Sequence, residues 1–282
     1  MVKYSTPYVT EALATIINSI LSTGIFPSKL KEAKVIPLYK SADHSSFSNY
    51  RPISLLNIFS KIVEKVINSR LVSFLDKHSI ISNCQFGFRS GHSTYMPLVS
   101  ILDKITEAQE KNLFTTALFI DLRKAFDTLN HQLLLIKLEH YGIRGVPFQL
   151  ISNYLLNRPQ YVSYDNAKSS SLAIQTGVPQ GSILGPLLFL IYINDIQYST
   201  KLLSLYLFAD DTTALDSDKD PEVLALRINQ EIVHLNHWFK LNKLSLNIEK
   251  TKYINFGIPK KKDKHKNIST LKIDNIDLQR VA

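Results

Sequence analysis

Apolar residues recur along this chain with two spacings, one typical of helices and one typical of strands. Helical spacing predicts helices over about 13–21, 58–75, 94–112, 130–141, 147–157, 187–196 and 221–241. Short apolar or β-branched runs predict strands over 33–39, 116–120, 160–164, 172–175 and 252–256, and a hairpin over 202–215. Gly24 is suited to end the first helix, and Pro221 to begin the last one.

The order of these elements in the second half of the chain defines a fold class. A strand, helices, a strand-turn-strand unit, a helix and a final strand follow one another from residue 116 to residue 256. This is the split βαβ pattern of ferredoxin-like folds, and it predicts one sheet with helices packed on one face. We therefore expect an α+β (mixed α/β) protein.

Composition narrows the class of partner. The chain has 282 residues, 45% of them hydrophobic and 20% charged, which suits one large globular domain or two small ones. Its formal net charge of +9 favours a polyanion such as nucleic acid. Five lysines in Pro259–Lys266 are better explained by a solvated loop than by nucleic-acid contact or a nuclear address.

Cysteine content and hydropathy bear on the compartment. Cys84 is the only cysteine, so an intrachain disulfide and a cysteine-based zinc site are excluded, which fits an intracellular, reducing compartment. The most apolar window, 187–193, is too short to cross a bilayer, so we expect no membrane partner. The sequence does not distinguish a nuclear from a cytoplasmic location. It also does not predict an oligomeric state.

Carboxylates occur at two strand ends. Asp121 follows the apolar strand 116–120, and Asp210 and Asp211 lie at the turn of the hairpin, 210 − 121 = 89 residues later. An Asp-Asp pair alone is better explained as an exposed turn. If the strand and the hairpin belong to one sheet, the three carboxylates converge, and carboxylate oxygens are the ligands that Mg²⁺ prefers. Such a set can hold two divalent ions about 3.5–4 Å apart.

The sequence resembles the reverse transcriptases of non-LTR retrotransposons, the LINE or jockey-like elements, from about residue 26 to residue 256. The resemblance rests on six motifs in the order of that family: Asn49–Leu56, Gln85–Arg89 with Ser93-Thr94, Asp121–Asp127, Gly177–Pro186, Phe208–Asp211 and Leu246–Thr251. Each motif alone is weak, whereas six in order are very specific.

The resemblance implies a right-hand polymerase with a ferredoxin-like split βαβ palm and a helical fingers region. It places fingers at 1–114 and a palm with inserted fingers helices at 115–282, within one reverse transcriptase domain of roughly 26–282. It also implies that the thumb is absent, because the sequence stops where the primer-gripping hairpin of the family begins. Loss of those phosphate contacts predicts weak or no processive synthesis.

The resemblance also assigns roles in catalysis. Asp121 and Asp210 correspond to the metal ligands and Asp211 supports them, with two Mg²⁺ ions as cofactors and Mn²⁺ as an alternative. Phe126, five residues after Asp121, corresponds to the side chain that excludes a ribose 2′-OH, the group that separates RNA from DNA. Lys250 corresponds to a proton donor for pyrophosphate. Plain core packing remains an alternative for Phe126, and an ordinary surface lysine for Lys250.

Further residues correspond to substrate contacts. Lys40, Arg51 and Gln180 match nucleotide-binding positions, with a solvated lysine or a structural turn as alternatives for Lys40 and Gln180. Gln85 and Arg89 match positions that contact template or primer, with helix capping or a salt bridge competing about equally.

The function implied is RNA-directed DNA polymerase: an RNA template, a DNA primer and deoxynucleoside triphosphates (dNTPs) are the partners. Two alternatives stay open. One is a truncated, inactive remnant that at most binds RNA. The other is a different right-hand polymerase, of the group II intron type or a viral RNA polymerase, although the latter usually carries Gly-Asp-Asp where this chain has Phe208-Ala209-Asp210-Asp211.

Overall fold

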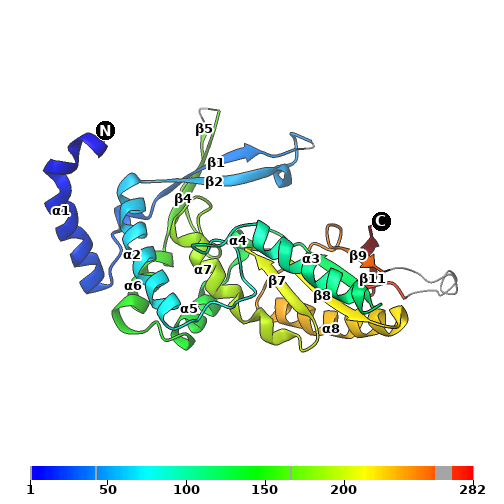
Figure 1. Cartoon of the computed structure of the whole chain (residues 1–282). Coiled ribbons are helices and arrows are strands. Elements are labelled where there is room, and N and C mark those ends of the chain that lie inside the picture. The colour runs from blue at the N-terminus through cyan, green and yellow to red at the C-terminus, as the bar shows by residue number, and fades with distance from the viewer. Residues whose placement is uncertain (1, 42, 166, 258–268, 282) are drawn as a thin grey trace. The chain divides into compact units, whose positions relative to one another are not determined.

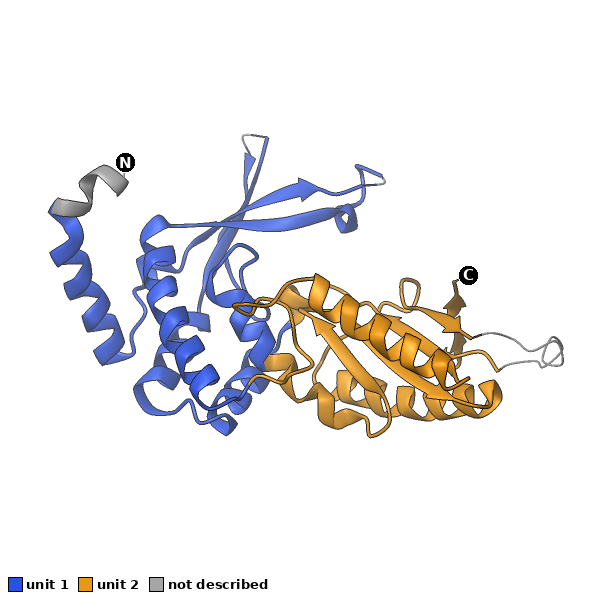
Figure 2. Cartoon of the chain, in the orientation of Figure 1, with its two compact units in different colours: residues 1–80, 129–191 blue, residues 81–128, 192–282 orange. Residues whose placement is uncertain are grey.

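A computed structural model describes residues 2–41, 43–165, 167–257 and 269–281. Its two compact units alternate along the sequence (Figure 2): unit 1 comprises Met1–Ile80 and Leu129–Ile191, and unit 2 comprises Ile81–Thr128 and Tyr192–Ala282. Residues 81–114 belong to unit 2 and 129–191 to unit 1, and the expected division into fingers at 1–114 and palm at 115–282 stays a prediction. The lysine-rich run 259–266 lies outside the described residues.

Unit 1 is built on a small sheet of strand order β2-β1-β4-β5, with β6 also paired to β4 (Figure 1). The strands are β1 Ala33–Tyr39, β2 Tyr50–Leu56, β4 Pro159–Tyr164, β5 Ala167–Lys168 and β6 Leu172–Ala173. β1 is antiparallel to β2 and parallel to β4. The sequence did not predict β2, which contains Pro52; as an edge strand, β2 tolerates a residue without an N–H.

Helices and short helical turns complete unit 1. They are α1 Val2–Thr23, η1 Ser28–Leu30, η2 Phe47–Asn49, α2 Ile58–Lys77, α5 His131–His140, α6 Gly145–Leu155 and α7 Leu184–Ile193, whose last two residues belong to unit 2. The predicted apolar stripe of α2 is partly wrong: Ile58 and Phe59 are exposed, and the buried stripe includes Ser60 and Glu64. Among the described residues, every helix is too short or too polar to span a membrane.

Unit 2 contains the predicted split βαβ sheet, in strand order β12-β9-β3-β8-β7. The strands are β3 Phe114–Ile120, β7 Ser204–Phe208, β8 Asp211–Asp218, β9 Lys252–Phe256 and β12 Gln279–Arg280, and a separate hairpin joins β10 Lys272–Ile273 to β11 Ile276–Asp277. β3 lies between β8 and β9 and is antiparallel to both. The arrangement β9-β3-β8-β7 is the order of a ferredoxin-like palm.

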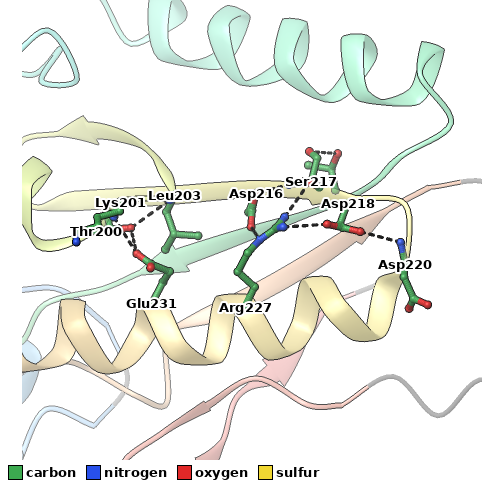
Figure 3. Close-up of polar contacts among 10 residues, drawn as sticks. Thr200, Lys201, Leu203, Asp216, Ser217, Asp218, Asp220, Arg227 and Glu231 are labelled. Carbon is green, nitrogen blue, oxygen red and sulfur yellow. Dashed lines mark hydrogen bonds and ion pairs between the residues drawn. The ribbon is translucent and has the colours of Figure 1, made fainter.

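Helices cover both faces of this sheet, which corrects the expectation of one covered face. The helical segments of unit 2 are α3 Tyr95–Glu110, α4 Ala125–Thr128, η3 Asn194–Ser199 and α8 Pro221–Leu241. Ile105 of α3 packs on Ala117 and Leu215, whereas Arg227 of α8 reaches Asp216, whose side chain points to the opposite face of β8 (Figure 3). The split βαβ pattern, which begins at residue 116, includes α8 but not α3, and it therefore predicted only one covered face.

Polar contacts attach α8 to β8, the second strand of the hairpin that carries Asp210 (Figure 3). Arg227 donates from Nε to Asp216 at 2.5 Å and from Nη1 to Asp218 at 2.8 Å. Farther along α8, the carboxylate of Glu231 accepts hydrogen bonds from the hydroxyl of Thr200 and the backbone N–H of Lys201, just before β7. One helix therefore fixes the far ends of both strands, β7 and β8.

Candidate active site

The register of β3 and β8 brings the three carboxylates to one edge of the unit 2 sheet. Ile120 pairs with Thr212 at the end of the ladder, so the next residues along the two strands are Asp121 and Asp211. Asp210 lies in the two-residue turn between Phe208 and Asp211, which pair with each other. The predicted convergence of strand and hairpin in one sheet is thus what the structure shows.

The turn itself has an unfavourable backbone. Ala209 has φ = 58° and is the only non-glycine residue of the turn with a positive φ. A positive φ at the first central position is the type II′ pattern, which normally takes glycine there. An L-residue in this region costs about 1–2 kcal/mol. The surrounding structure must therefore hold the turn that carries Asp210.

The Gln85–Arg89 motif stabilises this turn. Gln85 is 2% exposed, and its side-chain amide bonds the backbone of Ala209. Its side chain thus faces the hairpin, and its predicted contact with template or primer stays a prediction. Arg89, the other residue predicted for that contact, donates from Nη1 to the carbonyls of Ser82 and Gln85, at 3.0 and 3.1 Å.

Phe126 lies on α4, directly after the strand end that carries Asp121. Its ring meets the ring of Phe88 edge-on, with centroids 6.3 Å apart. Phe88 is exposed and has φ = 54°, a backbone strain of the kind that clusters at functional sites. The Gln85–Arg89 motif therefore touches both the hairpin and the neighbourhood of Phe126.

A second segment orients Asp121. Asn247 donates from Nδ2 to Oδ2 of Asp121 at 2.8 Å, and its backbone N–H donates to the Asp121 carbonyl at 2.8 Å. The hydroxyl of Thr251 accepts from the N–H of Asp121 at 3.3 Å. The Leu246–Thr251 motif was noted in the sequence, but only Lys250 was singled out there. Lys250 is exposed in the same turn, and its proposed proton-donor role stays a prediction.

Burial and neighbouring charge raise the pKa values of two of the three carboxylates. Burial raises the pKa of Asp210, and the charges of Asp211 and Asp121 raise it further. Partial loss of water contact and the charge of Asp121 raise the pKa of Asp211. Each of these groups is therefore harder to ionise than a free aspartate, because burial removes water from the carboxylate and like charges lie nearby.

The chemistry of these side chains, carboxylate oxygens only, is that of Mg²⁺ ligands. Within the described ranges, no group of three or more His, Cys, Asp or Glu side chains encloses a common metal position. Mg²⁺ typically takes one or two carboxylates and completes its octahedron with water and substrate phosphates. The oxygen donors and their mutual repulsion suit that mode of binding.

Metal binding should weaken in acid. A divalent cation bound at Asp210 and Asp211 would compete with protons for these carboxylates, whose pKa values are raised, so lowering the pH would favour the protonated forms. We expect the rise in melting temperature on adding Mg²⁺ to be clearly smaller at pH 5 than at pH 7.5. Thermal unfolding with and without Mg²⁺ at both pH values measures this, and an equal rise at both would contradict it.

Three predicted nucleotide contacts lie in unit 1. Arg51 is in β2 opposite Leu38, and Lys40 follows β1, so strand alternation places both on the same sheet face. The backbone carbonyl of Gln180 accepts from the N–H of Ser54 in β2, at 2.7 Å. The Gly-Pro-Gln loop is therefore attached to the strand that carries Arg51.

Sequence reasoning missed the residue that anchors this loop. Glu64 of α2 is fully buried, and its Oε2 accepts from the N–H of Ile183 at 2.7 Å and of Leu184 at 3.3 Å. A carboxylate there satisfies the free N–H groups at the start of α7 and complements the helix dipole. The sequence could have indicated this role, because Glu64 is a charged residue among apolar residues with helical spacing in α2.

Comparisons with known proteins fit this geometry. Residues 40–274 match the family model described as reverse transcriptase (RNA-dependent DNA polymerase). The chain is 32% identical over 258 residues to the RNA-directed DNA polymerase from mobile element jockey of Drosophila melanogaster, covering 88% of this chain and 28% of that protein. It is also 32% identical over 253 residues to the probable RNA-directed DNA polymerase from transposon BS of the same species, covering 85% and 27%.

Solved structures agree on the fold. The telomerase of Candida tropicalis in complex with a fragment of telomeric RNA aligns over 96% of this chain and 47% of its own, with a TM-score of 0.61 and 13% identity. A truncated apo form of that telomerase gives a TM-score of 0.57 at 14% identity, covering 83% of this chain and 52% of its own.

The fold and its matched motifs define a right-hand polymerase. The chain belongs to the reverse transcriptase family, and its similarity to jockey and the transposon BS protein confirms the non-LTR retrotransposon resemblance drawn from the motifs. The chain spans less than a third of the length of these relatives.

Proposed function

We propose that this chain carries out RNA-directed DNA synthesis. The observation that carries the proposal is the placement of Asp121, Asp210 and Asp211 at one edge of a palm-type sheet. In the reaction, the 3′-oxygen of a DNA primer forms a bond to the α-phosphorus of a dNTP, and the bond from that phosphorus to pyrophosphate breaks. The RNA template selects the dNTP by base pairing.

In this proposal the carboxylates bind two Mg²⁺ ions, or Mn²⁺ in their place. Bound Mg²⁺ neutralises charge on the phosphates and lowers the pKa of the attacking hydroxyl. Asp121 and Asp210 hold the ions, Asp211 supports them, and Asn247 fixes the orientation of Asp121. The reverse transcriptase family is generally dependent on divalent metals, which supports this role for the carboxylates.

Other residues serve binding and proton transfer. Lys40 and Arg51 bind the triphosphate, and Gln180 contacts the nucleotide and the templating base, with its loop anchored by Glu64. Lys250 protonates the leaving pyrophosphate, and Arg89 acts near template or primer. Unit 1 has the elements expected of fingers and unit 2 those of a palm, so we assign those roles to the units in place of a division at residue 114.

Phe126 selects deoxynucleotides by filling the space that a ribose 2′-OH needs. Phe126→Ala should therefore lower the preference for dNTPs over ribonucleotides at least about tenfold, since removing the ring removes the clash. Single-nucleotide addition with dGTP and with GTP opposite the same template base measures this ratio. An unchanged ratio would assign Phe126 to packing with Phe88 instead.

The proposal is tested by adding one nucleotide at a time to a DNA primer on an RNA template, with enzyme in excess so that processivity does not matter. We expect Mg²⁺-dependent addition of the complementary dNTP only. RNA binding measured on the same template separates the rival account: binding that is unchanged by Asp210→Asn, with no addition by the wild type, would identify an inactive RNA-binding remnant.

A further inference from the structure

The start of the Gln85–Arg89 motif, together with Cys84, pairs with β7 of the hairpin that carries Asp210. The N–H of Leu207 in β7 donates to the carbonyl of Cys84 at 2.7 Å, and the N–H of Phe86 donates to the carbonyl of Leu207 at 2.8 Å. This is a short parallel bridge between Gln85 and Leu207. It places the Gln85 side chain next to the turn at the tip of the hairpin.

The amide of Gln85 satisfies both backbone groups of one turn residue. Its Oε1 accepts from the N–H of Ala209 at 3.0 Å and from the N–H of Gly87 at 2.8 Å. Its Nε2 donates to the carbonyl of Ala209 at 3.3 Å. Both Gln85 and Ala209 are buried, so water does not replace these bonds. A single side chain therefore fixes the peptide planes on both sides of Ala209.

Those two peptide planes determine where the next residue points. Ala209 has φ = 58°, a conformation that costs an L-residue about 1–2 kcal/mol, and Asp210 follows it directly. Without an external hold, Ala209 gains by relaxing toward negative φ, and the Asp210 carboxylate moves with it. An amide suits this task because it both donates and accepts, whereas a carboxylate only accepts and an aliphatic chain does neither.

We propose that Gln85 is a positioning residue of the metal site, which holds Ala209 so that the Asp210 carboxylate faces Asp121. The proposal rests on the proposed function, since it assumes that Asp210 binds a divalent ion. It replaces nucleic-acid contact as the role of this side chain. Partners behind a metal ligand typically change metal affinity 10- to 100-fold when they are removed.

The test uses the full chain, Gln85→Met and two readouts. Methionine keeps the length of the side chain and removes its donor and acceptor. Hydrogen exchange followed by NMR should show the Ala209 amide exchanging at least about tenfold faster, because its acceptor is gone. Mn²⁺ titration followed by electron paramagnetic resonance should show about tenfold weaker binding. Gln85→Glu, which keeps the acceptor but not the donor to the Ala209 carbonyl, should weaken Mn²⁺ binding as well.

A matched control exists elsewhere in unit 2. Asn229 of α8 makes the same two-point contact: its Oδ1 accepts from the N–H of Lys272 at 2.9 Å and its Nδ2 donates to the carbonyl of Thr270 at 3.0 Å. Asn229→Leu removes an equivalent clamp away from the hairpin. It should lower the melting temperature while leaving Mn²⁺ affinity within about twofold of the wild type.

Each other outcome overturns the proposal in a recognisable way. Unchanged exchange of the Ala209 amide in Gln85→Met would mean that the clamp does not exist. Faster exchange with unchanged Mn²⁺ affinity would make Gln85 structural only. Wild-type Mn²⁺ binding that Asp210→Asn does not weaken would defeat the proposed metal site itself, and the role of Gln85 with it. If Gln85→Met does not fold, Mn²⁺ titration of Gln85→Glu takes its place, and unchanged Mn²⁺ affinity there would make Gln85 structural only.

Discussion

Asp210→Asn should reduce nucleotide addition by about 10³-fold or more while making the metal-free protein more stable. The loss follows because a metal ligand contributes several kcal/mol of transition-state stabilisation, and each 1.36 kcal/mol is a factor of ten in rate. The gain follows from the raised pKa of Asp210, caused by burial and by the charges of Asp211 and Asp121. Ionising this group at neutral pH therefore costs the folded state more than the unfolded chain.

The direction of the change in stability of metal-free Asp210→Asn tests whether ionised Asp210 destabilises the fold. Because the folded-state pKa of Asp210 is raised, its ionisation lowers the free energy of unfolding as pH rises through that value. Asparagine removes this cost, and we expect the melting temperature without metal to rise. Added Mg²⁺ should then raise the melting temperature of the wild type but not of the variant.

Thermal unfolding beside single-nucleotide addition measures both effects. Asp103 is an exposed carboxylate of α3 in the same unit, so Asp103→Asn serves as the control and should change neither quantity appreciably. A melting temperature of Asp210→Asn at or below that of the wild type would contradict the account of repulsion between the carboxylates.

Gly87→Ala should have the second large effect, because no side chain fits at this position. A Cβ on Gly87 would lie 2.3 Å from the backbone N of Ala209 and 2.9 Å from the carbonyl carbon of Phe208. Both are backbone atoms of the hairpin that carries Asp210, so the hairpin or the Gln85–Arg89 segment has to move. We expect a loss of about 1–3 kcal/mol in the free energy of unfolding. A displacement near 1 Å also predicts roughly 10²-fold slower nucleotide addition.

Gly91 provides the comparison for Gly87. A Cβ built there meets no heavy atom of the described residues within 4 Å, although its φ of +73° disfavours an L-residue. Gly91→Ala should therefore cost only about 1–2 kcal/mol of backbone strain and leave the rate of nucleotide addition nearly unchanged. Chemical denaturation and the addition assay on both variants separate strain from displacement of the hairpin, and equal rates for the two variants would contradict the close contact.

The sequence predicted those parts of the fold that depend on local pattern. The apolar run before Asp121 and the hairpin around Asp210 were found because each is a short strand with a distinct composition. The six ordered motifs predicted the family, which the match over residues 40–274 confirms. β2 was missed because it coincides with a motif and contains Pro52, which reads as loop unless the strand is known to lie at a sheet edge.

The remainder depended on contacts between distant parts of the chain. Gln85 and Ala209 are 124 residues apart, and Asn247 and Asp121 are 126 apart, so no local spacing relates them. Gln85 and Asn247 both lie inside motifs quoted from the sequence, but a motif does not indicate whether a polar side chain contacts substrate or backbone. The second covered face of the unit 2 sheet was missed for a similar reason, since α3 precedes the strands that it covers.

Anomalous X-ray diffraction would show whether Asp121 and Asp210 bind a common divalent ion. Crystals of the chain with an RNA–DNA primer duplex and a dNTP would be soaked in Mn²⁺ and measured at the manganese absorption edge. The account predicts an anomalous peak bonded to carboxylate oxygens of both Asp121 and Asp210, at roughly 2.0–2.3 Å. A bound dNTP with no such peak, or with manganese that contacts neither aspartate, would contradict it.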